Sequence, residues 1–172
     1  LKTSTVTGKR TKAAWIDQPF SVAKVEIDDA ITQQSRNLVE SLRYTPGVMI
    51  QKTANGHGSP FIRGFTGYRT LALIDGVRYN NSVYRDGPNE YFSLIDRDAL
   101  ERIELIQGPS SVVFGNDSIG GTLNLITRPT GYLEREGFYS KQDLSYRYSS
   151  AENSHQARAS YELGVGSDWG LR

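Results

Sequence analysis

Hydrophobic and polar residues alternate in several short stretches of the chain, a pattern typical of β-strands with one buried face. Phe20–Ile27 is the first such stretch, and Val48–Gln51 predicts a second, shorter strand. Between them, Leu38, Val39 and Leu42 form the apolar stripe of a predicted short helix. Together with a short helix directly after the first strand, the first fifty residues therefore predict a strand, two helices and a strand.

Polar residues indicate where the predicted helices begin and end. Asp28 and Asp29 can cap a short helix after the first strand, which is a simpler role than a catalytic acid pair. Ser35 is a possible N-cap of the second helix, and Pro46-Gly47 ends it.

Two further strands are predicted on either side of the short turn "FTGY". The segments "PFIRG" and "RTLALIDG" then form a hairpin, and the Asp75-Gly76 pair at its end is more typical of a turn than of a catalytic carboxylate. The first strand of a hairpin begins, and its second strand ends, at the same end of the sheet. The loop before the hairpin, Thr53–Ser59, and the loop after it, Tyr79–Tyr91, are therefore predicted to lie side by side.

The stretch "ELIQGPSSVVFGNDSIGGTLNLITR" predicts a tightly folded backbone. A helical turn at Asp98–Arg102 precedes a strand at Ile103–Gln107. After this strand, Gly108 and Pro109 are predicted to reverse the chain. Ser110 is predicted to cap one helical turn, and Gly115 to end that turn. Gly120 and Gly121 then lead into the last strand. These glycines are interpreted as devices for close packing, not as catalytic groups.

The pattern changes after Arg128 to long alternating runs. "KQDLSYRYSS" and "HQARASYELGVG", separated by "SAENS", predict a hairpin with one apolar and one polar face. This alternation is the weak signature of membrane β-barrel strands, and it also fits a hairpin packed on a soluble core. An isolated hairpin is marginally stable in water, so this one needs a partner.

Composition excludes several classes of protein. Lys plus Arg total 20 and Asp plus Glu 19, and this net charge of +1 gives no basis for nucleic-acid binding. No cysteine is present, which excludes disulfides and thiolate metal sites. His57 and His155 have no metal-ligand spacing, and no phosphate-binding, nucleophile or zinc-protease motif occurs. We therefore expect no enzyme, no metal and no cofactor.

Three motifs in order give a resemblance to a known family. "TPGVMIQ", "FIRGFTGYRTLALIDGVR" and "LERIELIQGPSSVVFGNDSIGGTLNLITR" resemble the plug domain of TonB-dependent outer-membrane transporters, over roughly Val22 to Arg128. The resemblance implies an α+β plug with a small mixed sheet and short helices, lying inside a 22-stranded barrel. We expect an N-terminal segment at 1–20, the plug at 21–130, and at 131–172 a linker and the first hairpin of the transmembrane β-barrel, with the rest of the barrel outside this chain.

The resemblance also implies a function. The family imports iron chelates, haem, cobalamin or similar scarce nutrients across the bacterial outer membrane, with energy from the periplasmic partner TonB. The implied partners are TonB, the protein's own barrel, the outer membrane and a small nutrient. Two alternatives stay open: a signalling receptor of the same fold, with an extra domain before Leu1, and a soluble module that uses the plug fold to bind a ligand. The hairpin argues against the soluble module.

Two sets of contact residues follow from the resemblance. "STVTGKR" is similar to the TonB box, placed near 3–8, so Thr5, Val6 and Thr7 would bind TonB by strand addition. A plain N-terminal tail is the alternative. Arg102 and Glu104 match a charged pair that faces the barrel wall in the family. Gln107 stands where the family usually has Arg, which puts one plug–barrel ion pair in question.

In the family, the outward end of the plug is the floor of the ligand site. The residues expected to bind ligand there are Asn55, His57, Asn80, Asn81, Tyr84, Arg85, Asn89 and Tyr91. Tyrosines offer flat apolar faces with hydroxyls, asparagines offer hydrogen bonds, and Arg85 offers a bidentate donor for a carboxylate or catecholate. Alternatively, the tyrosines pack on the barrel and Arg85 pairs with Asp86 or Glu90. His57 could ligate haem iron, or be a solvated loop histidine.

Overall fold

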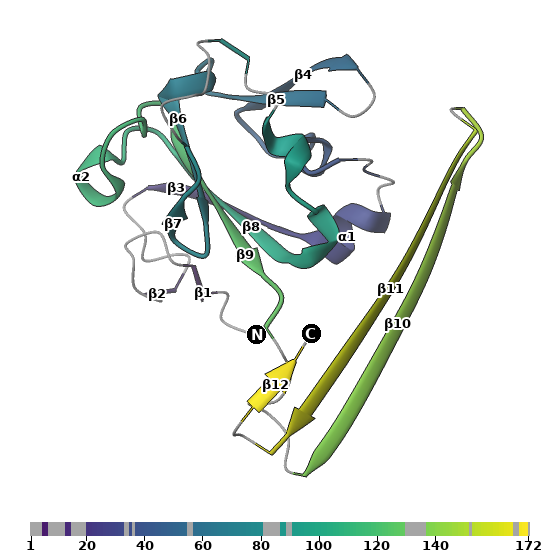
Figure 1. The fold of residues 1–172 in the computed structure, drawn as a ribbon. Helices are drawn as coiled ribbons and strands as arrows, with labels where there is room; N and C mark the ends of the chain where they lie inside the picture. The colour runs from purple at the N-terminus through teal and green to yellow at the C-terminus, as the bar shows by residue number, and fades with distance from the viewer. Residues whose placement is uncertain are drawn as a thin grey trace. The chain divides into compact units, whose positions relative to one another are not determined.

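The computed structural model describes residues 5–6, 13–14, 20–32, 35, 37–54, 57–80, 87–88, 91–129, 137–151, 153–166 and 169–171. The chain divides into two compact units, Leu1–Arg128 and Pro129–Arg172. Figure 1 labels the strands and helices of both units in chain order.

A five-stranded sheet forms the centre of the first unit (Figure 1). Its strands lie in the order β3 (Ser21–Glu26), β8 (Leu100–Gln107), β9 (Gly121–Thr127), β6 (Thr70–Ile74) and β7 (Val77–Arg78). Neighbouring strands are antiparallel, except that β6 and β9 run parallel. A small mixed sheet with short helices confirms the predicted α+β class.

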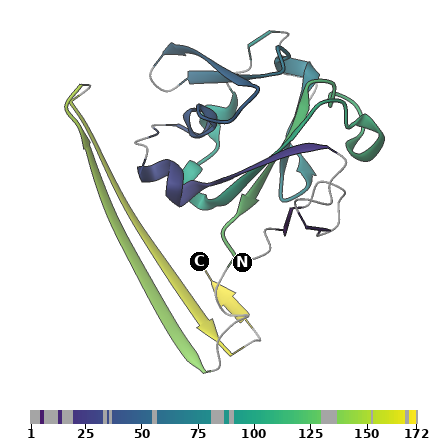
Figure 2. The ribbon, with the colours of Figure 1, turned by 180° about the vertical axis from the view of Figure 1, so that it is seen from behind.

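The described helical segments are all short. They are α1 (Ile27–Thr32), η2 (Val39–Leu42), η3 (Gly67–Arg69), η4 (Tyr91–Leu94), η5 (Arg97–Ala99) and α2 (Ser111–Phe114), where η marks a 3-10 helix. Figures 1 and 2 show α1 and α2 at opposite ends of the sheet. Among the described residues, no helix has the length and apolar character needed to cross a membrane.

The helix predicted after Ser35 is wrong in extent, because only the single turn η2 forms. Asn37 supplies the local cap instead of Ser35: its Oδ1 accepts a hydrogen bond from the Glu40 backbone N–H at 2.9 Å. Ser35 is buried, and its carbonyl oxygen accepts a hydrogen bond from the buried guanidinium of Arg97. The predicted stripe of Leu38, Val39 and Leu42 is confirmed, since each is 2% exposed.

The carboxylates after the first strand lie inside the helix and not before it. The helix α1 begins at Ile27, so Asp28 and Asp29 occupy its first turn. Negative charge is favourable there because it faces the positive end of the helix dipole.

The loop predicted at Thr53–Ser59 is wrong. Strand β4 (Val48–Ala54) and strand β5 (His57–Ile62) pair as an antiparallel two-stranded sheet, and the pairing extends to Ala54 opposite His57. The glycines and the asparagine of Thr53–Ser59 indicated a loop, but only two residues separate β4 from β5. The polar ends of these two strands therefore still pair. Only the turn itself lies outside the described residues.

The hairpin predicted between β5 and β6 is also wrong. Strand β5 pairs with β4, whereas β6 pairs with β9 and β7. The cause is the turn that follows Ile62: Arg63 and Gly64 have positive φ angles of 51° and 85°, and Ile62 bonds back to Phe65 through N–H···O contacts of 2.8 and 3.0 Å. The chain therefore turns sharply before β6 and enters a different sheet.

Close glycine packing joins this turn to the central sheet. A Cβ placed on Gly120 would lie 2.5 Å from the Cβ of Phe65, and one on Gly121 would lie 2.6 Å from the carbonyl oxygen of Ile106. Gly108 and Gly115 have φ angles of +100° and +89°. Each of the four glycines therefore has either a positive φ angle or a close contact with another segment.

A ring of buried hydroxyls ties the loop between β8 and β9 together. The Oγ of Ser110 lies 2.5 Å from the Oγ of Ser118 and 2.9 Å from the Oγ1 of Thr122, and Ser118 lies 2.5 Å from Thr122. Each hydroxyl can donate one bond and accept another, so all three are satisfied away from water. Ser110 therefore holds the loop through this ring, and its side chain makes no cap bond to α2.

Both faces of the central sheet are buried in part. The face that carries Ile103, Leu105, Leu123 and Leu125 packs in one cluster with η2 and β5. The other face forms a second cluster with α2. The members of that second cluster are Val22, Leu71, Leu73, Ile106 and Phe114. Burial on both sides also encloses polar residues of these strands, since Glu104, Thr122 and Asn124 are at most 4% exposed.

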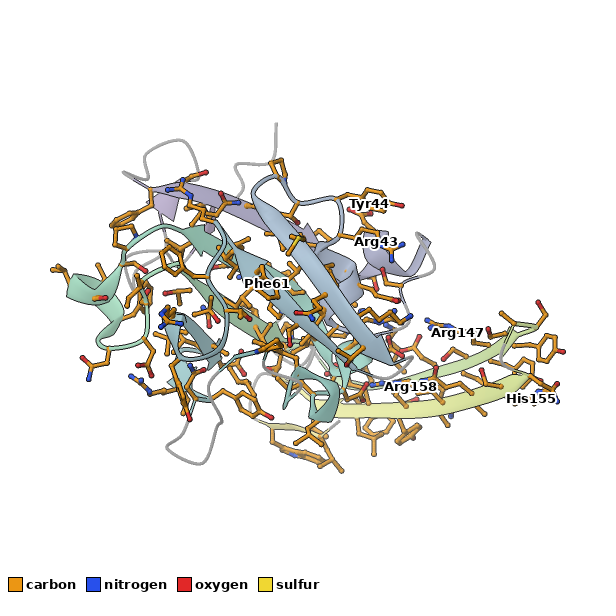
Figure 3. The ribbon with its side chains drawn as sticks, turned by 90° about the horizontal axis from the view of Figure 1, so that it is seen from above. Arg43, Tyr44, Phe61, Arg147, His155 and Arg158 are labelled. Carbon is orange, nitrogen blue, oxygen red and sulfur yellow. The ribbon has the colours of Figure 1, made fainter. Side chains whose placement is uncertain are left out.

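The second unit is the predicted hairpin. Strands β10 (Phe138–Ser149) and β11 (Ser154–Val165) pair along their whole length, and β12 (Trp169–Leu171) adds to β11. One face is apolar and exposed. It carries Phe138, Leu144, Tyr146, Tyr148, Tyr161 and Val165, which are 37% to 84% exposed. Figure 3 shows Arg147 and Arg158 on the two long strands, and His155 near the turn between them.

Candidate functional site

The segment between Asn80 and Tyr91 begins at a firm anchor. Asn80 follows the edge strand β7, and only 8% of its surface is exposed. Its Oδ1 accepts a hydrogen bond from the Ala72 N–H at 2.9 Å, and its Nδ2 donates to the Thr70 carbonyl oxygen at 2.8 Å. The amide thus continues the ladder of β6. Asn80 is joined to the sheet by its amide, which is already used in these two bonds and is not available to a ligand.

A second support lies in the middle of the segment, at Gly87. The backbone of Gly87 packs directly against Gly67 in η3: a Cβ on Gly67 would overlap the carbonyl oxygen of Gly87 and lie 3.2 Å from its nitrogen. Gly67 is buried and has a φ angle of +63°. Only glycine allows two backbones to come so close at such a φ angle.

The third support is the 3-10 turn η4, at the end of the segment. Phe92 is 4% exposed and belongs to the main core cluster, so it fixes η4 in the protein interior. The turn η4 lies against β5. The two loops were expected to lie side by side because of a hairpin that the structure does not contain. The contact between η4 and β5 nevertheless brings Tyr91, at the end of the second loop, next to the strand that begins at His57.

The structure does not describe the placement of most residues that were expected to bind ligand. Asn55, Asn81, Tyr84, Arg85 and Asn89 lie outside the described residues. For His57 and Tyr91 the backbone is described, as the first residues of β5 and η4, and the side chains are not. Their roles stay predictions. The contact between Gly67 and Gly87 was not predicted from the sequence. Two glycines in predicted turns, without an assigned role, were the only indication of it in the sequence.

The outer face of the β4–β5 pair is partly apolar. Met49 on β4 stands opposite Phe61 on β5 and is 60% exposed. Tyr44 is 70% exposed in the turn before β4. Figure 3 shows Arg43 and Tyr44 together at the end of this pair, with Phe61 on the strand.

Arg102 and Glu104 form an internal ion pair on β8. Arg102 Nε lies 2.9 Å from Glu104 Oε1, and Arg102 Nη1 lies 3.1 Å from Glu101 Oε2. The Glu104 side chain has 0% exposure and that of Arg102 has 16%. Of the two, only Arg102 retains exposed surface for a further contact.

Gln107 also faces inward. It is 8% exposed, and its Nε2 donates a hydrogen bond to the Pro46 carbonyl oxygen at 2.5 Å. Its Oε1 fills the space beside Gly47, where a Cβ would lie 2.9 Å away. The glutamine therefore joins β8 to the turn before β4.

The N-terminal segment contains a short strand pair. Strand β1 (Thr5–Val6) pairs antiparallel with β2 (Ala13–Ala14). The backbone at Thr5 and Val6 is extended, as strand addition requires. Thr7 lies outside the described residues.

An ion pair joins the beginning and the end of the first unit. Arg128 Nη2 lies 2.5 Å from Asp28 Oδ1, and the Arg128 N–H donates to the Ala99 carbonyl oxygen at 3.0 Å. The hydrogen bond to Asp28 raises the pKa of Arg128, although burial acts in the opposite direction. Residues 27–32 are thereby tied to the point where the chain leaves the first unit.

The described residues contain no group of three or more His, Cys, Asp or Glu side chains that could hold a metal ion. The first unit has a plug-like α+β fold, and the hairpin of the second unit has one apolar and one polar face.

Comparison with known proteins identifies the family. The model of the TonB-dependent Receptor Plug Domain matches residues 15–122. The chain belongs to this family. The match confirms the resemblance seen in the three sequence motifs. It covers β3, β6, β7, β8 and the loop after β8, and it ends two residues into β9.

Named relatives include two transporters. The chain is 38% identical over 110 residues to "Vitamin B12 transporter BtuB" of Photobacterium profundum, covering 63% of this chain and 17% of that protein. It is 33% identical over 129 residues to the "Ferrichrome outer membrane transporter/phage receptor" of Escherichia coli, covering 72% of this chain and 16% of that one. The chain thus spans about a sixth of the length of these relatives. Such plug domains belong to outer-membrane transporters and receptors, and not to enzymes.

Solved structures share the fold of both units. The pyoverdine outer membrane receptor FpvA of Pseudomonas aeruginosa, bound to pyoverdine, aligns with a TM-score of 0.66 at 21% identity, over 93% of this chain and 22% of that one. The copper transporter OprC aligns with a TM-score of 0.65 at 20% identity, over 84% of this chain and 21% of that one. The alignment with FpvA includes most of the hairpin, in agreement with the expected plug and first barrel strands.

Proposed function

We propose that this chain is the plug, with the first barrel hairpin, of an energy-coupled receptor that imports a scarce nutrient such as an iron chelate, haem or cobalamin. The observation that carries the proposal is the plug-family match over residues 15–122. It is followed in the same chain by a long hairpin with one exposed apolar face. The relatives are named as transporters of vitamin B12 and ferrichrome, which supports a nutrient of this class.

The proposed ligand-binding floor is the segment from Asn81 to Tyr91, together with the β4–β5 turn. The described residues within and beside this segment contact the first unit: Asn80 bonds to β6, Gly87 contacts Gly67, and Phe92 packs in the core. The proposed contact residues are Asn55, His57, Asn81, Tyr84, Arg85, Asn89 and Tyr91.

The proposed coupling segment is β1. Thr5, Val6 and Thr7 would add as a strand to TonB on the periplasmic side. The pairing of Thr5 and Val6 with Ala14 and Ala13 supports an extended conformation at this segment. It also means that TonB would compete with β2 for one edge of β1.

The proposed contact with the barrel uses the polar surface of the plug. Arg102 keeps exposed surface for a barrel carboxylate, whereas Glu104 orients Arg102 from inside the plug. In the hairpin, the polar face with Arg147 and Arg158 would line the barrel interior, and the face with Leu144 would meet lipid.

Growth of a receptor-deficient bacterium carrying the full-length protein tests this function. Cells are starved and supplied with cyanocobalamin, ferrichrome, haem or ferric pyoverdine as the sole source of cobalamin or iron. We expect growth on one of them that is lost when TonB is deleted. Growth that persists without TonB would contradict energy coupling, and a receptor that supports growth on none of the four would contradict this nutrient class.

A further inference from the structure

We propose that Arg147 and Arg158 form a binding site for negatively charged groups of the imported nutrient, which is then an anionic iron chelate with carboxylate or catecholate groups. This inference rests on the proposed function, in which the polar face of the β10–β11 hairpin lines the barrel interior. Both arginines lie on that face, and both side chains are half-buried.

The register of the hairpin makes the two arginines diagonal neighbours. Arg147 on β10 stands opposite Gln156, and Arg158 follows two residues later on β11, opposite Ser145. Residues in this relation lie roughly 7–8 Å apart, within reach of long side chains. Figure 3 shows the two arginines on the two long strands of the hairpin. One anionic group can therefore contact both guanidinium groups.

Charge is distributed unevenly along the polar face. Near the start of β10, Lys141 Nζ lies 3.4 Å from Asp143 Oδ2, and Glu162 accepts a hydrogen bond from the Tyr139 hydroxyl. The described positions of the same face that lie closer to the turn are Ser145, Arg147, Ser149, Ser154, Gln156 and Arg158. These positions carry two positive charges and no carboxylate. Because like charges repel each other, an anion bound between the arginines is favoured.

His155 is also close to the turn, but it does not belong to this site. It stands opposite Tyr148 on the apolar face of the hairpin. Its Nδ1 lies 2.5 Å from the Tyr146 hydroxyl oxygen, and the centroid of its ring lies 4.8 Å from that of Tyr148. The site for an anion thus consists of the two arginines, with serine and glutamine side chains beside them.

The geometry of the guanidinium group selects the kind of anion. Each guanidinium has several N–H donors in a planar fork, so a contact elsewhere in the protein does not use all of them. A carboxylate, or the paired oxygens of a catecholate, accepts parallel N–H bonds from such a fork. Positive charge in the barrel interior also attracts an anionic chelate before contact, which raises its association rate at low salt. A neutral nutrient gains from neither effect.

Titration of the purified full-length receptor tests the site. The anionic probes are ferric tris-catecholate, ferric citrate and haemin, and the neutral probes are ferrichrome and cyanocobalamin. We expect wild type to bind an anionic probe, and Arg147→Gln combined with Arg158→Gln to weaken that binding by at least about tenfold. Lys141→Gln removes one positive charge from the other end of the same face, where Asp143 is its neighbour, and should change the affinity by less than about twofold.

The salt dependence of association separates ligand contact from a structural role. In wild type, the association rate of the anionic probe should fall as salt rises from about 0.01 M to about 1 M, because screening shortens the reach of the charges. The double glutamine variant should lose most of this fall. A variant that binds more weakly, melts at a lower temperature and keeps the salt dependence would assign the arginines to contacts within the protein, and would overturn the proposal.

The probes also separate this inference from nutrient import itself. Equal affinity for the anionic probe in wild type and in the double glutamine variant would overturn the site. Wild type that binds only ferrichrome or cyanocobalamin would overturn the inference and leave nutrient import intact. Binding of none of these probes would overturn the inference, and the growth experiment then decides whether import fails as well.

A second variant covers the case in which the double glutamine variant does not accumulate in the membrane. Arg147→Lys combined with Arg158→Lys keeps both charges and removes the planar fork. We expect the salt dependence to remain and the affinity for the anionic probe to fall at least about threefold. Lost salt dependence despite the retained charges, or unchanged affinity despite the lost fork, would overturn the proposal.

Discussion

The ring of Tyr139 covers Gly164 on the neighbouring strand of the β10–β11 hairpin. A Cβ on Gly164 would overlap the ring carbons, and the Tyr139 hydroxyl donates a hydrogen bond to Glu162 Oε1 at 2.9 Å. Tyr139 is 9% exposed, although the hairpin around it is mostly exposed. A glycine in a strand normally weakens it, and here the tyrosine from the adjacent strand replaces the missing side chain.

The first prediction concerns this pair. Gly164→Ala should displace the Tyr139 ring and destabilise the full-length receptor by roughly 1–3 kcal/mol, as overpacking does. Tyr139→Phe keeps the ring and loses only the hydroxyl bond, so it should cost about 1 kcal/mol. Thermal unfolding of purified receptor measures both. Ser160→Ala, on the same face of β11, is the control and should melt like wild type; an equally stable Gly164→Ala would show that the ring is free to move aside.

The second prediction concerns the glycines around the loop between β8 and β9. Each of Gly108→Ala, Gly115→Ala, Gly120→Ala and Gly121→Ala should cost roughly 1 kcal/mol or more, because alanine is strained at positive φ or clashes. Gly121→Ala should cost more than Gly115→Ala, since a methyl group on Gly121 meets the Ile106 carbonyl oxygen at 2.6 Å, and one on Gly115 meets nothing within 4 Å. Melting temperatures of the four variants measure the order. The reverse order would show that φ strain outweighs the clash.

Local patterns were enough to predict some elements of this fold and not others. The β10–β11 hairpin and the stripe of Leu38, Val39 and Leu42 were predicted from the spacing of hydrophobic residues alone. The structure contains both. The pairing of β6 was missed because its parallel partner β9 lies about fifty residues later, and nothing near Thr70 indicates it. Nearest-neighbour reasoning therefore favoured a hairpin.

The candidate site shows the same limit. The polar composition of the Tyr79–Tyr91 segment predicts a loop, but the sequence could not separate binding residues from supporting ones. Asn80 looks like its neighbour Asn81, and only the bonds to β6 assign it a structural role. The Gly67–Gly87 contact depends on two backbones that are distant in sequence.

The third prediction concerns the ion pair between Asp28 and Arg128. Asp28 is 73% exposed and Arg128 25%, so Asp28→Asn should cost at most about 1 kcal/mol. The pKa of Arg128 is raised in the folded state, so its contribution is complete below the unfolded pKa and is lost only at strongly alkaline pH. Stability from Arg128 should therefore be constant between about pH 5 and 9.

Denaturant unfolding at low and high salt measures this contribution. The difference between wild type and Asp28→Asn should shrink as salt rises to about 1 M, where the screening length falls to roughly 3 Å. Asp29→Asn, one residue along in the same first turn, is the matched control for the loss of a helix-dipole interaction. An effect of equal size in both variants would assign the stabilisation to the dipole and not to Arg128.

The fourth prediction concerns Glu104. Glu104→Gln removes the fully buried carboxylate that pairs with Arg102, while Arg102 keeps Glu101 and some exposed surface, so it should destabilise the protein by about 1–3 kcal/mol. Glu101→Gln removes the other, 40% exposed partner of Arg102 and should cost no more than about 1 kcal/mol. Thermal unfolding of both variants measures the contrast. Equal costs would mean that solvent screens Glu104 as well as Glu101.

The last prediction concerns the proposed ligand contacts. Replacing Tyr84, Arg85 and Tyr91 together with alanine removes two aromatic faces and one bidentate donor from the proposed ligand segment. Ligand binding by the full-length receptor should weaken by at least about tenfold, or 1.4 kcal/mol, while receptor abundance in the membrane stays the same. Titration of the nutrient that supports growth measures the affinity, and immunoblotting measures the abundance.

A matched control for that triple variant lies on the same unit. Arg43 and Tyr44 are an exposed arginine and tyrosine in the turn before β4, and neither belongs to the proposed ligand segment. Replacing both with alanine removes similar chemical groups, and should leave affinity unchanged. If the control weakens binding as much as the triple variant, the loss reflects general surface change. If neither does, the ligand is held by barrel loops alone, and the segment from Asn81 to Tyr91 has no part in recognition.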